Sequence, residues 1–253
     1  MSPTEPKSAR NRGLRGYASL VSRITRNYLE TSYLRRVAKS IHDRGFWLTM
    51  RLIWDERWPD HRYRINIAGI VPLDNVEIPS GNRYHGVRYE AVNRSAFRAA
   101  MDEVRIPFED FTFVDLGAGK GFAMILAAAY GFRKLIGVEF APSLAAEARR
   151  NMERVKARDH SLPEWEIIQL DVTHLHLPAG NLLFFMCNPF DDVVLRNTFD
   201  NIVKQATPTR QVIVVYVNAL HRHVLAELGF QLDYFSPNDP LLVYKGGIAM
   251  YRL

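Results

Sequence analysis

The stretch Phe113-Val-Asp-Leu-Gly-Ala-Gly-Lys-Gly121 joins an apolar run to a glycine-rich turn. A second apolar segment, residues 122–130, follows immediately and has the length of a core helix. Gly117, Gly119 and Gly121 carry no side chains, so the backbone of the turn can come close to another group. The start of the following helix directs its amide groups to the same place. The stretch therefore predicts a strand–turn–helix unit with a ligand over the turn.

Apolar runs and helical patterns alternate through the rest of the chain. We expect strands at 111–116, 134–139, 166–170, 182–187, 211–217, 230–235 and 241–251, and helices at 91–104, 121–130, 143–157, 193–205 and 219–228. Such alternation is typical of an α/β fold in which helices cover both faces of a parallel sheet. The turn-rich stretch 236–240 joins the last two strands, which should therefore pair antiparallel.

The front of the chain differs in character from this domain, which we place at 91–253. Residues 1–13 are polar and lack periodicity, and we expect a disordered tail. Residues 14–90 are expected to form a basic helical cap, beginning with an amphipathic helix over 17–41. Residues 1–64 hold 14 Lys and Arg against 6 Asp and Glu, whereas the remainder holds 19 against 21. The basic side chains either form a solvated face or contact phosphates.

Composition excludes several classes of protein. With 47% hydrophobic and 24% charged residues, the 253-residue chain is ordinary for a globular protein. A single cysteine, Cys187, excludes an intramolecular disulfide and a cysteine-rich zinc site, and we expect no metal. No apolar run approaches the roughly 18–20 residues that span a membrane. We therefore expect a soluble, cytoplasmic protein without a membrane span.

The spacing of the glycines and the charge beside them narrow the choice of ligand. The dinucleotide pattern GxGxxG places its third glycine one residue later, and the phosphate-binding pattern GxxxxGK[ST] is absent. Asp115 lies two residues before the first glycine, where a carboxylate would repel phosphates. The same carboxylate would attract a cation such as the amino group and sulfonium of S-adenosylmethionine.

Two further acids end the next two predicted strands. Glu139 lies 22 residues beyond Gly117, where a carboxylate can accept hydrogen bonds from both ribose hydroxyls, a feature that NAD-binding proteins share. Asp171 is followed by Val172, a pair suited to the amino group and the ring of adenine. Asp171 could equally be a helix N-cap. Three carboxylates at one edge of the sheet predict a nucleoside site.

The segments VDLGAGKG, IGVEFAP, LDVT and FMCNPF resemble, in this order, the motifs of class I S-adenosylmethionine-dependent methyltransferases over residues 110–218. They are most similar to a bacterial group that combines DLGxGKG, GVEF and NPF motifs behind an Arg-rich N-terminus. The resemblance implies a Rossmann-like seven-stranded sheet whose last strand is antiparallel. It also implies that Asp115 and the three turn glycines hold the methionine part, Glu139 the ribose and Asp171 the adenine.

Residues 188–190, Asn-Pro-Phe, follow the fourth predicted strand, where ligands collect in open α/β sheets. The Asn188 carbonyl can accept from an N–H of the methyl acceptor, and Phe190 can pack against the acceptor or the sulfonium. The triplet is similar to the NPPY motif of amino- and amide-methylating enzymes, although the second proline is missing and Phe replaces Tyr. This favours nitrogen as the acceptor atom, in a small molecule or a protein side chain; an ordinary turn is the alternative.

Other polar residues are weaker candidates. The resemblance places Tyr89 and Glu90 near the methyl donor. A general base could come from a histidine after a strand, although such histidines are usually exposed or structurally bonded: His174, His176, His221 and His223. Cys187 lies in an apolar run and is expected to be a small buried hydrophobe.

Two other functions remain open beside methyl transfer. A NAD-dependent oxidoreductase would share the turn and the ribose carboxylate. A non-catalytic, nucleic-acid-associated module could retain the nucleoside pocket and use the basic front segment for contact.

Overall fold

The computed structural model describes residues 42, 46, 50, 64–67, 91–237 and 248–253. The chain divides into two compact units, Met1–Ile53 and Trp54–Leu253. In the first unit, the described residues His42, Phe46 and Met50 are helical. The predicted tail, the helix over 17–41 and most of the predicted cap lie outside the described residues. The second unit holds the sheet and the candidate site.

Seven strands form one mixed sheet in the order β3-β2-β1-β4-β5-β7-β6. The strands are β1 (Phe111–Leu116), β2 (Lys134–Glu139), β3 (Glu164–Gln169), β4 (Asn181–Cys187), β5 (Val212–Val217), β6 (Gln231–Ser236) and β7 (Ile248–Arg252). Strands β1 to β5 pair in parallel, whereas β7 runs antiparallel to both β5 and β6. The predicted seven-stranded Rossmann-like sheet with an antiparallel last strand is therefore confirmed.

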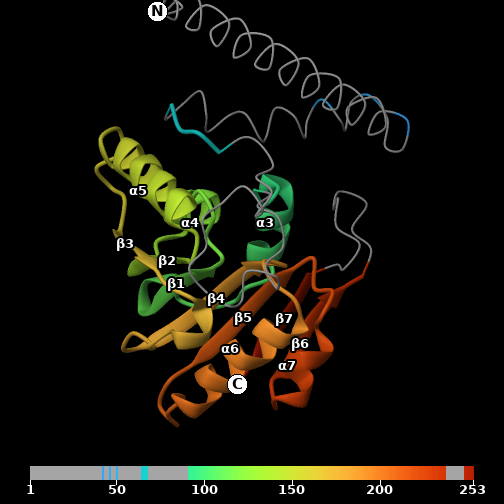
Figure 1. The fold of residues 1–253 in the computed structure, drawn as a ribbon. Helices are drawn as coiled ribbons and strands as arrows, with labels where there is room; N and C mark the ends of the chain where they lie inside the picture. Colours follow the sequence, from blue (N-terminus) through green and yellow to red (C-terminus); the bar gives the residue numbers. More distant parts are fainter. Residues whose placement is uncertain (1–41, 43–45, 47–49, 51–63, 68–90, 238–247) are drawn as a thin grey trace, which may run out of the picture. The chain divides into compact units, whose positions relative to one another are not determined.

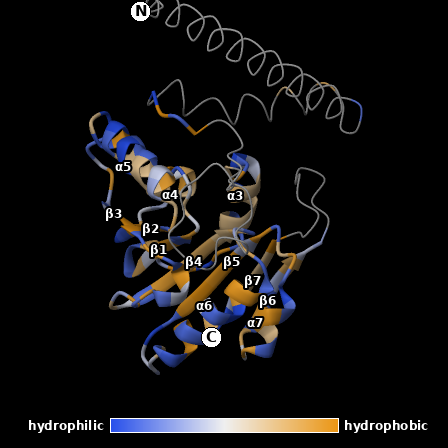
Figure 2. Ribbon diagram, in the orientation of Figure 1, coloured by the Kyte–Doolittle hydropathy of each residue, from blue (hydrophilic) through white to orange (hydrophobic). Residues whose placement is uncertain are grey.

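Helices cover both faces of the sheet, as predicted (Figure 1). The helices are α3 (Arg94–Asp102), α4 (Phe122–Ala127), α5 (Pro142–Lys156), α6 (Asp192–Lys204) and α7 (His223–Glu227), with short 3-10 turns η3 (Phe108–Asp110), η4 (Ala128–Tyr130) and η5 (Val172–His174). Helices α3, α4 and α5 pack on one hydrophobic cluster, and α6 and α7 pack on a second. Figure 2 shows the apolar strands between these two layers.

Alternating side chains assign each strand position to one of the two clusters. In β1, Phe113 belongs to the cluster beneath α3, α4 and α5, whereas Val114 and Leu116 belong to the cluster beneath α6 and α7. Asp115 therefore points to the same face as Phe113. In β2 the same alternation places Glu139 on the face of Leu135. Both acids thus lie under the α3–α5 layer, at the carboxyl ends of neighbouring strands.

Two helices begin later than predicted, for local reasons. Helix α3 begins at Arg94 because the Asn93 side chain caps it, accepting from the amides of Ser95 and Ala96. Helix α7 begins only at His223; Asn218 has a φ of 55°, and its carbonyl accepts from the Leu220 amide in a tight turn. The predicted helix over 219–228 is therefore too long at its start.

The edge strand β3 is strongly charged. Lys134 on β2 forms ion pairs with Glu164 at 3.0 Å and with Glu166 at 3.1 Å. These two acids lie on β3, which pairs with β2 and with no other strand of the described residues. The edge of the sheet therefore carries an ion-paired charged row. Among the described residues, no helix is long and apolar enough to cross a membrane.

Candidate functional site

The glycine turn follows β1 and has a strongly constrained backbone. Gly117, Gly119 and Gly121 have φ values of 81°, 53° and 82°, in the left-handed region that glycine adopts without strain. Gly121 is also the N-cap of α4. The predicted strand–turn–helix unit is confirmed, and the three glycines are required by the conformation of the turn.

Most amides of the turn donate to the protein itself. Gly117 and Ala118 donate to the Val138 carbonyl at 2.9 and 3.0 Å, and Gly121 donates to the Ala118 carbonyl at 2.8 Å. Gly119 donates to Oε2 of Glu139 at 2.8 Å. A phosphate-binding loop needs amides directed at its ligand. Because these four amides already have acceptors, the turn does not have the donor set of a pyrophosphate cradle.

The turn meets the Asn-Pro-Phe segment at the point where the strand order reverses. Strand β1 lies between β2 and β4, and ligands collect at such a switch point in open α/β sheets. A Cβ atom added to Gly117 would lie 2.5 Å from Cβ of Pro189. The structure thus brings two segments that are some 70 residues apart in sequence into direct contact.

Glu139 is buried at the end of β2 and is oriented by backbone amides. Its Oε2 accepts from Gly119, and its Oε1 accepts from Ala141 at 2.8 Å. Burial raises the pKa of the Glu139 carboxyl, and the amides of Ala141, Gly119 and Phe140 oppose this rise. The carboxylate is therefore held in one orientation above the glycine turn.

Asp115 is a buried carboxylate without a partner in the described part of the chain. It is 4% exposed, and neither a hydrogen bond nor an ion pair to it occurs there. Burial and, secondarily, the charge of Glu139 raise its pKa from 3.8 to about 8. Two acids thus lie close together beside the turn. An ammonium or sulfonium group would stabilise both ionised carboxylates.

Asp171 lies two residues beyond β3 and is the N-cap of η5. Its Oδ1 accepts from the amide of Thr173 at 3.1 Å and from the Thr173 hydroxyl at 2.8 Å. The capping role considered for Asp171 is therefore confirmed. Val172 is buried, with 7% of its surface exposed, and packs in the cluster of the α6–α7 face. A role of these two residues toward adenine stays a prediction.

Asn188 follows β4 in a left-handed conformation, with a φ of 45°. Its side chain is 7% exposed, and its Oδ1 accepts from the hydroxyl of Tyr216 at 2.9 Å. Tyr216 is fully buried in β5, which raises its pKa, and a backbone hydrogen bond from His221 opposes the rise. The amide oxygen expected to face a methyl acceptor is thus already engaged, which leaves one lone pair available.

Phe190 and Cys187 flank Asn188 and belong to opposite faces. Phe190 is 6% exposed and packs in the cluster beneath α6 and α7, so its ring contributes to the core. Its expected contact with the acceptor stays a prediction. Cys187 is partly buried and packs against the cluster beneath α3, α4 and α5. It is therefore less buried than the small buried hydrophobe that we predicted.

The remaining candidates separate into exposed and undescribed residues. His174, His176 and His223 are exposed, and His221 is half-buried. The ring of His174 lies 3.2 Å from the Thr173 hydroxyl through Nδ1. No arrangement of these histidines singles out a general base. Tyr89 and Glu90 lie outside the described residues.

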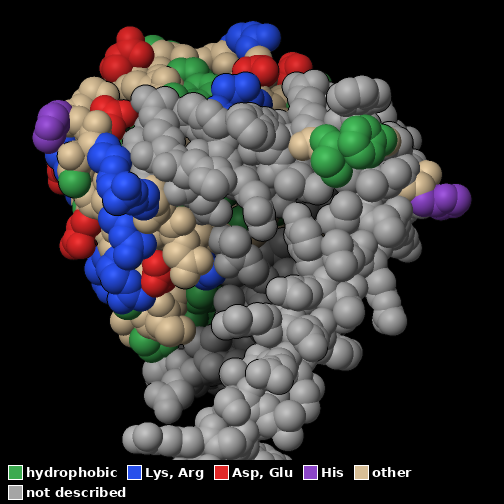
Figure 3. Space-filling view, turned by 90° about the horizontal axis from the view of Figure 1, so that it is seen from above, with side chains coloured by type: hydrophobic (Ala, Val, Ile, Leu, Met, Phe, Trp, Pro, Cys, Tyr) green, Lys and Arg blue, Asp and Glu red, His purple; other side chains and the backbone are tan. Residues whose placement is uncertain are grey.

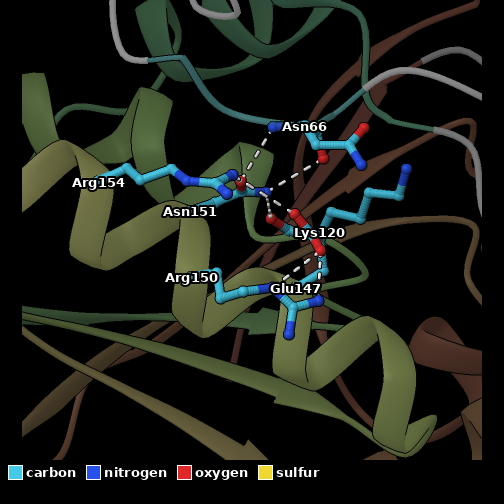
Figure 4. A network of polar contacts seen from close by, with 6 residues as sticks. All are labelled: Asn66, Lys120, Glu147, Arg150, Asn151 and Arg154. Atoms are coloured by element: carbon cyan, nitrogen blue, oxygen red, sulfur yellow. Dashed lines mark hydrogen bonds and ion pairs between the residues drawn. The ribbon is translucent and has the colours of Figure 1, made fainter.

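Asn151 joins the turn to a distant segment and was not anticipated from the sequence (Figure 4). It lies on α5, fully buried, and its Nδ2 donates to the Lys120 carbonyl at 3.0 Å. It also pairs with both backbone polar groups of Asn66. The signal in the sequence is an asparagine on the apolar face of a helix, because a buried amide must find hydrogen-bond partners.

Basic side chains gather in a row on the side of the described surface that carries α5 (Figure 3). Several are held by their own helix: Arg150 pairs with Glu147, and Arg154 lies 3.7 Å from the same carboxylate. Arg158 donates to the Arg154 carbonyl at 3.2 Å. Such local pairing is typical of a solvated face. Apart from residues 42, 46, 50 and 64, the basic segment 1–64 that raised the possibility of nucleic acid lies outside the described residues.

Solved structures of several methyltransferases are similar to the structure of this chain, at low sequence identity. A ribosomal protein L11 methylase from Lactobacillus delbrueckii subsp. bulgaricus is 14% identical, over 62% of this chain and 74% of that one, with a TM-score of 0.43. A magnesium protoporphyrin IX methyltransferase from Synechocystis PCC 6803 with bound S-adenosylmethionine is 15% identical, over 62% and 75%, with a TM-score of 0.44. A glycopeptide N-methyltransferase complexed with S-adenosylmethionine is 13% identical, over 63% and 92%, with a TM-score of 0.45. No protein-family model matches the sequence, and no significant match occurs among curated proteins.

Proposed function

We propose that the protein transfers a methyl group from S-adenosylmethionine to a nitrogen atom of a small molecule or a protein side chain. The observation that carries the proposal is Asp115, a buried carboxylate without a hydrogen-bond or ion-pair partner in the described residues, beside a second buried acid. A buried carboxylate favours a cationic ligand because that ligand supplies the missing charge.

In this proposal, each acid at the carboxyl edge of the sheet binds a different part of the cofactor. Asp115 attracts the ammonium group of the methionine part, over the turn formed by Gly117, Gly119 and Gly121. Glu139 is oriented by its backbone donors to accept from the ribose. Asp171 and Val172 follow the neighbouring strand and are assigned to the adenine. The bound cofactor would supply an electrophilic methyl group.

The methyl acceptor is assigned to the Asn188-Pro-Phe190 segment, which touches the glycine turn through Pro189. Methyl transfer is an in-line displacement, so the protein has to align a nitrogen lone pair with the methyl carbon and exclude water. Asn188 is suited to orient the acceptor, because its side chain is held by Tyr216. Phe190 supports the segment from the core.

A NAD-dependent oxidoreductase is the competing proposal. NAD and S-adenosylmethionine require different donors from the glycine turn. NAD needs amides directed at a pyrophosphate, whereas Gly117, Ala118, Gly119 and Gly121 donate internally. The buried carboxylate of Asp115 would also repel a pyrophosphate. Both features favour S-adenosylmethionine.

The test is calorimetric titration of the full chain with S-adenosylmethionine, S-adenosylhomocysteine and NAD. We expect both sulfur nucleosides to bind, and Glu139→Ala to weaken their binding at least about tenfold through loss of charged hydrogen bonds. Glu147→Ala removes an acid of α5 whose ion pairs, within the described ranges, are with Arg150 and Arg154, and it should leave the affinity unchanged. Binding of NAD with no binding of either sulfur nucleoside would overturn the proposal.

A further inference from the structure

Asn151 occupies a core position of α5 with a polar side chain. Its neighbours on the buried stripe of the helix are Leu144, Ala148 and Val155, all apolar. Asn151 itself has no exposed surface. Leaving a buried amide without partners costs about 1–3 kcal/mol, so this residue has to be satisfied by the elements around it.

Those partners come from two separate parts of the chain (Figure 4). The Oδ1 of Asn151 accepts from the Asn66 amide at 3.0 Å, and its Nδ2 donates to the Asn66 carbonyl at 3.2 Å. The second N–H of the same Nδ2 donates to the Lys120 carbonyl at 3.0 Å. Arg154 approaches Oδ1 at 3.4 Å. The side chain therefore uses both amide hydrogens and binds two backbone segments simultaneously.

The Lys120 end of this network belongs to the glycine turn. The preceding residue, Gly119, donates its amide to Glu139, and the following residue, Gly121, is the left-handed N-cap of α4. Asn151 therefore holds the carbonyl of Lys120, which lies between Gly119 and Gly121. A rotation of this peptide would disturb both neighbours.

The Asn66 end belongs to the short segment 64–67 that precedes the domain in sequence. Ile65 and Ile67 flank Asn66 and pack in the cluster beneath α3, α4 and α5, with 6% and 3% of their surfaces exposed. The segment is thus anchored by two apolar side chains and, between them, by both backbone groups of Asn66. Both of these Asn66 hydrogen bonds run to the side chain of Asn151.

We propose that Asn151 is a positioning residue of the cofactor site that couples ligand binding at the glycine turn to the attachment of residues 64–67. The inference rests on the proposed function, since it takes S-adenosylhomocysteine as the ligand of the turn. Coupling between two sites is reciprocal, so a ligand that orders the turn also strengthens the attachment of 64–67.

Substitutions can separate this hydrogen-bonding role from packing. Asn151→Asp keeps the shape but places an oxygen against the carbonyls of Asn66 and Lys120, whereas Asn151→Leu keeps the volume and removes all polar contacts. We expect each to weaken S-adenosylhomocysteine binding about tenfold, within the 5–150-fold range typical of coupled sites. Glu147→Gln, which changes an ion-paired acid on the same helix, should bind within about twofold of the wild-type protein.

Two further readouts would not respond to a general loss of stability. The defect of Asn151→Asp should shrink as the pH falls, because a protonated carboxyl regains one hydrogen to donate. Hydrogen exchange of the wild-type protein should show that S-adenosylhomocysteine slows exchange at 64–67. This second measurement decides the question even if both Asn151 variants fail to fold.

The outcomes distinguish this inference from the proposed function. If the wild-type protein does not bind S-adenosylhomocysteine, the proposed function fails, and the coupling fails with it. If the wild-type protein binds the ligand but exchange at 64–67 stays unchanged, the coupling alone is overturned. Folded Asn151 variants that bind within about twofold of the wild-type protein would overturn it equally.

Discussion

The hydroxyl of Tyr216, on β5, donates a 2.9 Å hydrogen bond to Oδ1 of Asn188, which directly follows the neighbouring parallel strand β4. Tyr216 is fully buried and Asn188 adopts a left-handed backbone conformation, so neither side chain has room to reorient without cost. The contact fixes which end of the Asn188 amide can turn toward a bound molecule.

Tyr216→Phe should lower the free energy of unfolding by about 0.5–1.5 kcal/mol, because it removes one buried hydrogen bond without creating a large cavity. Urea denaturation measures this loss. Tyr251→Phe is the matched control, since it removes a hydroxyl that donates to the Arg222 carbonyl at 3.1 Å. Only Tyr216→Phe should shift the side-chain amide signals of Asn188 in NMR spectra. Unchanged signals would mean that Tyr216 does not orient this amide.

Asp115→Asn should stabilise the ligand-free protein at pH 8 and have little effect near pH 4. The folded-state pKa of Asp115 is raised to about 8, above its ordinary value of 3.8. The contribution of Asp115 to stability is therefore fully present below about pH 4 and is lost as the pH rises from about 4 to about 8, because over this range the carboxyl ionises in the unfolded chain but stays protonated in the folded protein. Thermal denaturation at both pH values measures the difference. Asp110→Asn, which removes a carboxyl group at an exposed position, is the matched control.

Binding of S-adenosylmethionine should release a proton below pH 8. A cationic ligand favours the ionised form of Asp115, whose pKa therefore falls when the complex forms. The affinity should rise with pH between 6 and 8, by at most about tenfold per unit. Calorimetry in buffers of different ionisation enthalpy counts the protons released. Proton uptake, or a dependence that persists in Asp115→Asn, would contradict this role of Asp115.

Gly117→Ala should be more destabilising than Gly131→Ala. Both glycines have positive φ values, 81° and 82°, so alanine costs about 1–2 kcal/mol of backbone strain at each. At Gly117 the added Cβ would also lie 2.5 Å from Cβ of Pro189, whereas nothing lies within 4 Å at Gly131. We expect an additional loss of about 1–3 kcal/mol from this clash. Equal losses in urea denaturation would show that the turn can move away from Pro189.

The framework of the fold could be predicted because its signals are local. Strands β1 and β2 begin and end where their buried apolar runs meet turn residues, and their predicted bounds agree with the structure. The start of β3 and the start of α7 were less well predicted. Half of β3 is exposed at the sheet edge, and the chain before α7 is held in a turn at Asn218. Periodicity carries little information at such positions.

The candidate site was predictable only in part. Asp115 and Glu139 meet because the carboxyl ends of adjacent parallel strands share an edge, a rule that applies before any coordinates are known. The bonds of Asn151 to Asn66 and of Tyr216 to Asn188 join residues 85 and 28 positions apart. No spacing rule links such pairs, although a polar residue on an apolar helix face and a tyrosine in an apolar strand both indicate that a partner is needed.

The charged row on β3 also affects whether another strand can pair with this edge of the sheet. An edge strand offers unpaired backbone groups to any extended chain, and charged side chains there discourage such pairing. Glu164 and Glu166 form ion pairs with Lys134 and are largely exposed. An incoming strand would remove water from these charged side chains. The charges therefore disfavour aggregation by strand addition at this edge, beside the strand that ends at Glu139.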